Sequence, residues 1–380
     1  MAWLIFDLTG NAFYLGLVSA LGALPTVLLA PIAGVLADRL DRRRILMTAQ
    51  TITGGIMFGT GVLIISGQVQ PWHLFVVALV TGIFQALDEP ARQSLVPSLV
   101  PRQELPSAIS MGTSLWSIGQ VASPGVAGLI IAYVGAGPCF LVTAAGFWLS
   151  VLMLGFVRAR HVERDEKRHG ALQEMLAGFR YIRQDRVLIS LLSISLAVGA
   201  FGYAAFVLAP VFAIDILGVG AVGLGIIEAV AGLGGLVGTL LAARLGFHRR
   251  RGPILVIAAT LFGLLLVGFG YSRYFPLTLI IMAGVGFFDA VFINLALTVG
   301  QLSLPDDLRG RIMGIWGLTW FMPPFGGMLG GVISGVVGAP STVALFGMVV
   351  ATMALVVGAP GVRPLGRRPA ESAEANTARI

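Results

Sequence analysis

Two acidic residues stand inside long apolar stretches of the sequence, where a charge is costly. Asp289 lies near the middle of the stretch 275–302, and Glu228 lies about 10 Å from one end of the stretch 221–245. A charged side chain costs about 2.5–3.5 kcal/mol at mid-membrane, so it usually faces a cavity or a partner. We predict that both could carry a coupling proton. Glu228 could instead be a water-exposed carboxylate at the rim, and Asp215 is expected at the interface.

A second set of charges follows the first complete apolar stretch. The sequence there reads Gly34-Val-Leu-Ala-Asp38-Arg39-Leu-Asp-Arg42-Arg43-Arg44. Glycine permits close helix approach, Asp38 ends a helix, and arginines four and five residues later can reach carboxylates on neighbouring helices. This pattern favours a latch at one membrane face. The alternative is that the arginines only anchor the topology, and we prefer that interpretation for Arg44.

The stretch 106–134 contains residues that allow a helix to bend and to pack closely. Proline removes a backbone hydrogen bond and glycine removes bulk, so this helix is expected to pack tightly against a partner from the other half of the chain. The segment 323–327 repeats the pattern as Pro-Pro-Phe-Gly-Gly. The residues of the first motif are Gly119, Ser123, Pro124 and Gly128.

The residues that enzymes use are sparse. The four histidines fall in loops or at the edges of apolar stretches, and Cys139 is the only cysteine. No metal-binding set, phosphate loop or nucleophile constellation is recognisable, so we predict no metal, no cofactor and no enzyme activity. A membrane-embedded enzyme is the alternative class, and turnover without any gradient would favour it.

Composition and hydropathy predict the elements that position these residues. Apolar residues make up 57% of the chain and charged residues only 11%, which excludes a water-soluble core. We predict eleven complete membrane helices, preceded by Met1–Asp7 as the tail of a missing helix, with no signal peptide. The spans are expected at about 12–36, 45–67, 72–92, 106–134, 138–157, 187–217, 221–245, 253–272, 275–302, 311–337 and 340–358.

The basic residues orient these helices. Of the 25 Lys and Arg residues, 24 fall in alternate loops on one side of the predicted membrane, and only Arg273 falls on the other side. Because basic loops stay in the cytoplasm, we place the loop 158–186 and the C-terminus there, in a bacterial inner membrane. Charge confined to alternate loops also argues against nucleic acid as a partner of this basic chain.

An internal repeat divides the chain. Gly82-Ile-Phe-Gln-Ala86 matches Gly286-Phe-Phe-Asp-Ala290 at an offset of about 204 residues, and a run of three arginines follows a similar motif in each half. Helices of the same sense repeat after about six spans, which indicates parallel repeats. We predict an N-terminal bundle at 1–157, a cytoplasmic linker with an amphipathic helix at 158–186, a C-terminal bundle at 187–358 and a disordered cytoplasmic tail at 359–380.

The loop at 34–46 resembles the signature loop of the major facilitator superfamily, with Asp41 where many members have glycine. The segments 88–97 and 304–311 are similar to those of the branch that contains the enterobactin exporter and macrolide efflux proteins. The resemblance implies an all-α membrane fold of two six-helix bundles and a charged cytoplasmic gate. The gate residues it implies are Gly34, Asp38, Arg39, Arg42, Arg43, Asp88, Arg92, Arg244, Arg309 and Arg311.

The resemblance also implies a function. The helix at 106–134 is close to an antiporter signature, which favours proton-coupled efflux of small amphipathic molecules such as drugs or siderophores. We expect a monomer whose partners are the lipid bilayer, its substrate and protons. Uptake by symport and movement of lipid remain open alternatives. An apolar cavity with a few polar and aromatic groups is expected, and the candidates are Gln85, Trp116, Gln120, Tyr203, Asn294 and Trp320.

Overall fold

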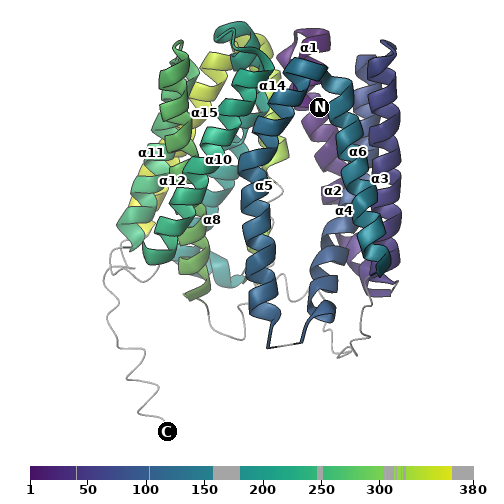
Figure 1. The fold of residues 1–380 in the computed structure, drawn as a ribbon. Coiled ribbons are helices and arrows are strands. Elements are labelled where there is room, and N and C mark those ends of the chain that lie inside the picture. Colours follow the sequence, from purple (N-terminus) through teal and green to yellow (C-terminus); the bar gives the residue numbers. More distant parts are fainter. Residues whose placement is uncertain are drawn as a thin grey trace. The chain divides into compact units, whose positions relative to one another are not determined.

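The structure is a computed structural model that describes the backbone of residues 1–361 except 40, 102, 157–179, 246–250, 303, 305–311, 314, 318 and 320–321. The side chains of 30–39, 94, 96–98, 106 and 302 also lie outside the description. Every regular element within the described residues is a helix (Figure 1). The predicted amphipathic helix in the linker and the tail beyond 361 fall almost entirely outside these ranges.

The membrane helices follow the predicted spans closely. Ten helices of the described chain are long and apolar enough to cross a membrane. The remaining predicted span, 311–337, is described as a continuous helix only over α14 (Pro323–Val337). The spanning helices are α2 (Ala12–Arg39), α3 (Arg42–Ile65), α4 (Pro71–Leu99), α5 (Leu105–Val134), α6 (Ala136–Phe156), α8 to η2 (Arg186–Ile216), α10 (Gly220–Leu245), α11 (Arg251–Tyr271), α12 (Phe275–Leu302) and α15 to α16 (Ala339–Gly361).

Short polar residues define where several helices begin. Asp41 is the N-cap of α3, because its carboxylate accepts hydrogen bonds from the backbone N–H groups of Arg43 and Arg44. Asp185 caps α8 in the same way. The aspartate that replaces glycine in the signature loop therefore has a structural role as a helix cap.

Two spans contain widened π-helical turns. The span 186–216 is made of α8 (Arg186–Ala197), η1 (Val198–Gly202), α9 (Ala204–Val211) and η2 (Phe212–Ile216), while the last span contains η4 (Ala354–Gly358). Gly199 in η1 lies against the segment that leads into α14, where a Cβ on it would be 3.2 Å from the Thr319 carbonyl oxygen. Such turns interrupt the regular hydrogen bonding of a helix and are frequent at functional sites.

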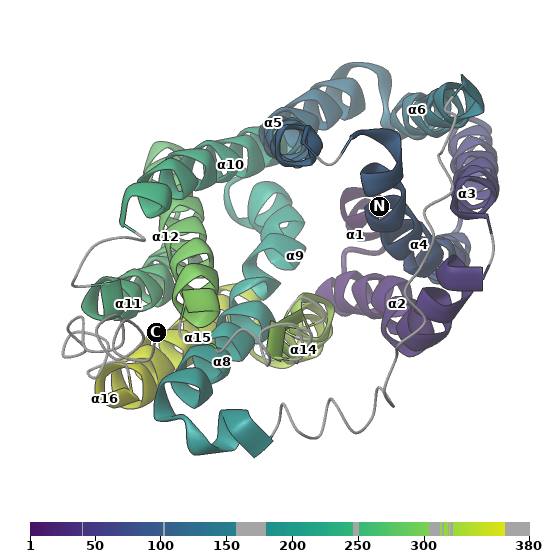
Figure 2. The ribbon, with the colours of Figure 1, turned by 90° about the horizontal axis from the view of Figure 1, so that it is seen from below.

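The chain forms two compact units whose boundaries differ from those of the predicted bundles. Unit 1 comprises residues 1–166 together with 206–229 and 327–339, and unit 2 comprises 167–205, 230–326 and 340–380. In unit 1, α2 packs on α4 and α3 packs on α6, as both views show (Figure 2). Unit 1 thus contains parts of three helices from the second half of the chain.

Equivalent glycines of the repeat make equivalent contacts within each unit. In unit 1, a Cβ on Gly82 of α4 would collide with the backbone carbonyl of Gly22 on α2. In unit 2, a Cβ on Gly286 of α12 would collide with the backbone carbonyl of Ala231 on α10. The two halves thus use the same glycine to bring the second and fourth helices of each repeat into backbone contact.

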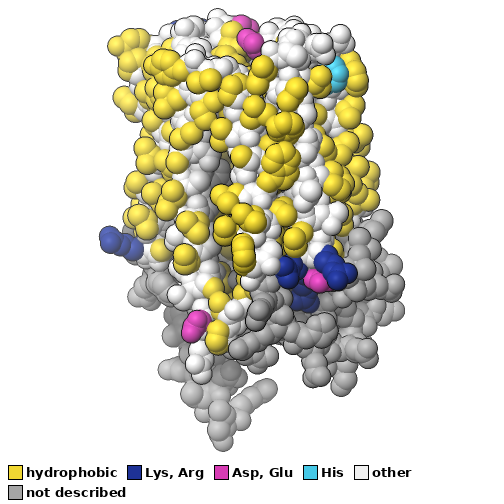
Figure 3. Space-filling view, turned by 45° about the vertical axis from the view of Figure 1, so that its right-hand side comes forward, with side chains coloured by type: hydrophobic (Ala, Val, Ile, Leu, Met, Phe, Trp, Pro, Cys, Tyr) yellow, Lys and Arg dark blue, Asp and Glu magenta, His cyan; other side chains and the backbone are white. Residues whose placement is uncertain are grey.

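Apolar side chains cover much of the outer surface. The face in Figure 3 is largely hydrophobic, and basic side chains are seen towards its lower margin. Exposed large side chains such as Leu28, Tyr133 and Ile280 are 63%, 82% and 71% accessible. A water-soluble protein would bury them, so this surface fits contact with lipid.

Candidate functional site

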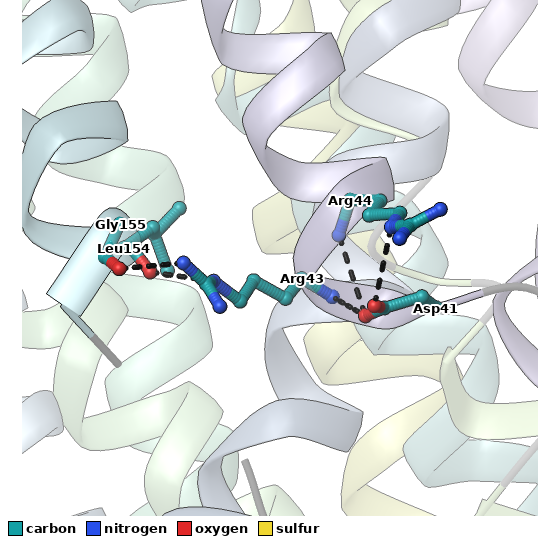
Figure 4. A network of polar contacts seen from close by, with 5 residues as sticks. All are labelled: Asp41, Arg43, Arg44, Leu154 and Gly155. Carbon is teal, nitrogen blue, oxygen red and sulfur yellow. Dashed lines mark hydrogen bonds and ion pairs between the residues drawn. The ribbon is translucent and has the colours of Figure 1, made fainter. Parts of the chain in front are cut away.

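The signature loop places three consecutive arginines at the start of α3. Figure 4 shows two of them, Arg43 and Arg44. Arg44 is exposed, and its guanidinium Nε lies 3.6 Å from Oδ2 of Asp41. Arg43 points away from this pair towards α6. The side chains of Asp38 and Arg39, and the surroundings of Gly34, lie outside the description, although all three residues belong to α2. The assignment of Gly34, Asp38 and Arg39 to the gate therefore stays a prediction.

Arg43 ties α3 to the end of α6. Its Nε donates a hydrogen bond of 2.7 Å to the carbonyl oxygen of Leu154, and its Nη2 donates one of 2.6 Å to that of Gly155. Both acceptors belong to the last turn of α6, where carbonyl groups have no partner within the helix. The sequence had suggested carboxylates as the target of this arginine, and the structure shows two backbone carbonyls instead.

Asp88 is the centre of a polar network between α3 and α4. Its Oδ1 accepts a 3.1 Å hydrogen bond from Nε2 of Gln50, and its Oδ2 lies 3.7 Å from Nε of Arg92. Arg92 also pairs with Glu89, which in turn accepts a hydrogen bond from Gln93. Sequence reasoning missed Gln50, and the one available signal was the presence of a glutamine within an apolar stretch.

The remaining predicted gate residues are less defined. Arg244 is an exposed residue in the last turn of α10, where a cation is favourable beside the helix C-terminus. Arg309 and Arg311 lie outside the described residues.

The motif in α5 makes a close helix crossing with α10 inside unit 1. A Cβ on Gly128 would be 2.6 Å from the carbonyl oxygen of Ala221 and 3.1 Å from Cα of Gly225. In the other direction, a Cβ on Gly225 would be 2.6 Å from the carbonyl oxygen of Pro124. The two backbones touch here with no side chain between them. At Gly119, the other end of the motif, a Cβ would make an ordinary contact of 3.9 Å with Oγ of Ser123 on the same helix.

A second crossing of this kind joins α2 and α14 in the same unit. A Cβ on Gly16 would be 2.9 Å from the carbonyl oxygen of Gly327 and 3.0 Å from Cα of Gly331. Gly327 belongs to the proline–glycine segment that echoes the motif of α5. Each crossing pairs a helix from the first half of the chain with one from the second half.

The two candidate proton carriers lie in different units. Glu228 is half-buried on α10 in unit 1, three residues after Gly225 and next to Ala229, which faces Gly125 of α5. Asp289 is half-buried on α12 in unit 2, three residues after Gly286. Within the described residues, neither carboxylate has a hydrogen-bond or ion-pair partner. Asp215 is exposed near the end of its span.

The predicted cavity residues have varied surroundings. Asn294 is half-buried and donates hydrogen bonds to Thr239 Oγ1 at 3.3 Å and to the Ala290 carbonyl oxygen at 2.8 Å. Tyr203 and Trp116 are 46% and 62% accessible. Gln85 and Gln120 are exposed, and Trp320 lies outside the described residues.

One cavity of unit 1, about 340 Å³ in volume, does not include any of these candidates. It is lined by Asp41, Arg44, Ile45, Thr48, Ala49, Phe84 and Leu87. In the part of the chain that the structure describes, no group of three or more His, Cys, Asp or Glu side chains could hold a metal ion.

Comparison with known proteins decides the family. Residues 1–377 match the family model described as "Transmembrane secretion effector". The chain belongs to this family of major facilitator transporters. It is therefore a multi-pass membrane transporter. This chain is 27% identical to the multidrug efflux pump Tap of Mycolicibacterium fortuitum, and the match covers 90% of this chain and 85% of Tap.

A second relative and two solved structures are also similar to this chain. The enterobactin exporter EntS of Escherichia coli O81 is 29% identical over 81% of this chain and 70% of that protein. The fold is similar to that of the nucleoside transporter NupG (TM-score 0.72, 16% identity, 94% and 92% of the two chains). It is also similar to an inward-facing bacterial homologue of the human lysosomal transporter Spinster (TM-score 0.66, 16% identity, 96% and 95%). These two similarities concern the fold alone.

Proposed function

We propose that this transporter exports small amphipathic molecules, such as drugs or siderophores, across a bacterial inner membrane in exchange for protons, by alternating access. The relatives named as a multidrug efflux pump and as an enterobactin exporter support export. Their 27–29% identity to this chain supports a shared direction of transport more than a shared substrate. The proposed orientation has the signature loop and the C-terminus in the cytoplasm.

The observation that carries the proton-coupling part is Asp289. It is a half-buried carboxylate within the apolar helix α12, and the described residues include no hydrogen-bond or ion-pair partner for it. An unpaired charge at such a depth costs about 2.5–3.5 kcal/mol on insertion scales, whereas a protonated carboxyl group avoids that cost. A carboxyl group that can be charged when water reaches it and neutral when water is excluded has the properties of a proton carrier.

The arrangement within unit 1 supports alternating access. Gly16 and Asp38 stand on the same helix, α2, about 33 Å apart along its axis, which is close to the thickness of the hydrocarbon core. One end of α2 makes the glycine crossing with α14, and the other end leads into the signature loop. Closure at one membrane face would use the glycine crossings, and closure at the other would use the charged gate.

The experiment is transport by the purified full-length chain in liposomes with an imposed pH gradient. We expect gradient-driven movement of a fluorescent amphipathic cation such as ethidium, or of enterobactin. Asp289→Asn should abolish the gradient-driven movement and retain substrate binding, because the amide cannot release a proton. The matched control is Asp215→Asn, which alters an exposed carboxylate near the end of a span and should transport normally.

Two results would contradict the proposal at different points. Full gradient-driven export by Asp289→Asn would remove this residue from proton coupling. Transport that is indifferent to the pH gradient in the parent protein would remove proton coupling itself.

A further inference from the structure

The arginines of the signature loop have different surroundings, although they are consecutive in the sequence. The side chain of Arg44 is 87% accessible, and its one ion pair among the described residues is with its neighbour Asp41. Arg43 is half-buried and reaches across to another helix. Figure 4 shows the two side chains leaving the start of α3 in opposite directions.

The end of α6 has a particular need for the group that Arg43 supplies. The last four carbonyl groups of a helix lack partners within it, and the helix dipole favours a cation there. The last turn of α6 contains no basic residue of its own. The guanidinium of Arg43 meets both needs, because its planar fork donates to the carbonyl oxygens of Leu154 and Gly155 at the same time.

We propose that Arg43 is a positioning residue that fixes the signature loop to the end of α6, and that it is not itself a contact of the gate. The same N-terminal turn of α3 begins with Arg42, the residue assigned to the gate, so an anchored Arg43 fixes the backbone that presents Arg42. α6 ends at Phe156, directly before the segment that joins the two halves of the repeat. The signature loop and the last turn of α6 therefore move as one body.

The division of roles among the arginines makes the proposal testable by matched substitutions. Arg43→Ala and Arg44→Ala each remove one positive charge from the same loop, so they change the topology signal equally. Only Arg43→Ala removes the cap from α6. Arg43→Lys retains the charge, but a single ammonium group cannot reproduce the two parallel hydrogen bonds.

The primary measurement is hydrogen–deuterium exchange of residues 150–156 in the full-length protein in detergent. We expect Arg43→Ala to exchange at least about tenfold faster than the parent in this turn, because charge-assisted hydrogen bonds at a helix end resist local opening. Arg44→Ala should exchange at the parent rate, and Arg43→Lys should be intermediate. If Arg43→Ala does not accumulate in the membrane, Arg43→Gln, which can bond one carbonyl, takes its place with the same expectation.

The consequence for transport rests on the proposed function, while the anchor itself does not. In the liposome assay, Arg43→Ala should lower the maximal transport rate with an unchanged half-saturating substrate concentration, and Arg44→Ala should leave both unchanged. Equal exchange rates for Arg43→Ala and Arg44→Ala would overturn the anchor. Fast exchange in Arg43→Ala combined with normal transport would retain the anchor and overturn its role in gating.

Discussion

The crossing of α5 and α10 offers a substitution whose effect can be worked out from the structure. At Gly128, an added methyl group would meet the Ala221 carbonyl oxygen at 2.6 Å and Cα of Gly225 at 3.1 Å. Both are backbone atoms, so neither can rotate away. Gly128→Ala should therefore disfavour the state in which these helices touch.

The size of the effect follows from the cost of overpacking. Adding a methyl group to a tight contact costs about 1–3 kcal/mol. If the α5–α10 contact belongs to one of two transport states, this cost shifts their ratio by about 5- to 150-fold. The state seen in the structure should lose most of its population, provided that the two states differ in free energy by only a few kcal/mol.

A disulfide across the same crossing can report that population. A Cβ on Gly125 would lie 3.9 Å from Cβ of Ala229, which is within the range that disulfides adopt. The double variant Gly125→Cys, Ala229→Cys, with Cys139→Ala to remove the only native cysteine, should cross-link under mild oxidation. We expect Gly128→Ala to slow this cross-linking by at least fivefold.

The matched control is another glycine of the same helix. Gly112 has no atom within 4 Å of an added Cβ, so Gly112→Ala should cross-link at the parent rate. Melting temperatures of both variants separate a shift between states from general unfolding. Equal cross-linking rates for Gly128→Ala and Gly112→Ala, with similar melting temperatures, would refute the reasoning.

Two further predictions concern packing within the units. Gln50→Leu removes a hydrogen-bond donor to the largely buried carboxylate of Asp88, so it should lower the free energy of unfolding by about 1–3 kcal/mol and lower the melting temperature. Gln93→Leu alters an exposed glutamine and should have almost no effect on either quantity. Gly82→Ala and Gly286→Ala should each lower the melting temperature by similar amounts, because the added methyl meets a backbone carbonyl in both halves. Gly59→Ala, with free space around it, should leave the melting temperature unchanged or raise it. A harmless Gly286→Ala beside a damaging Gly82→Ala would contradict equivalent packing in the two repeats.

The sequence predicted the helices well because each span needs about 20 apolar residues and is bounded by polar or glycine-rich segments. The predicted span 275–302 has the bounds of α12, and 187–217 differs from the observed span by one residue at each end. The family was also recognisable from the signature loop. These features are local in the sequence, so no knowledge of packing was required.

Contacts between distant segments could not be predicted in the same way. Nothing in the sequence near Arg43 indicates that its target is a pair of carbonyl groups 111 and 112 residues away. The partner of Asp88 on α3 was missed for the same reason, because Gln50 is a single polar residue whose orientation depends on how α3 packs on α4. The glycine motif of α5 indicated close packing, but the partner residue Gly225 could be found only from the structure.

Glycine crossings suit a transporter because they involve few side chains. A contact between two backbones fixes no rotamers and interlocks no side chains. Its formation therefore releases less free energy than the formation of a tightly packed core of side chains. The free energy that separates the open and closed states can then be a few kcal/mol. In the proposed exchange with protons, a single proton that crosses a potential of 100 mV would provide about 2.3 kcal/mol, which is of the size needed to drive such a change. If the crossings at Gly16 and Gly128 were interlocked by large side chains instead, the same proton could not open them.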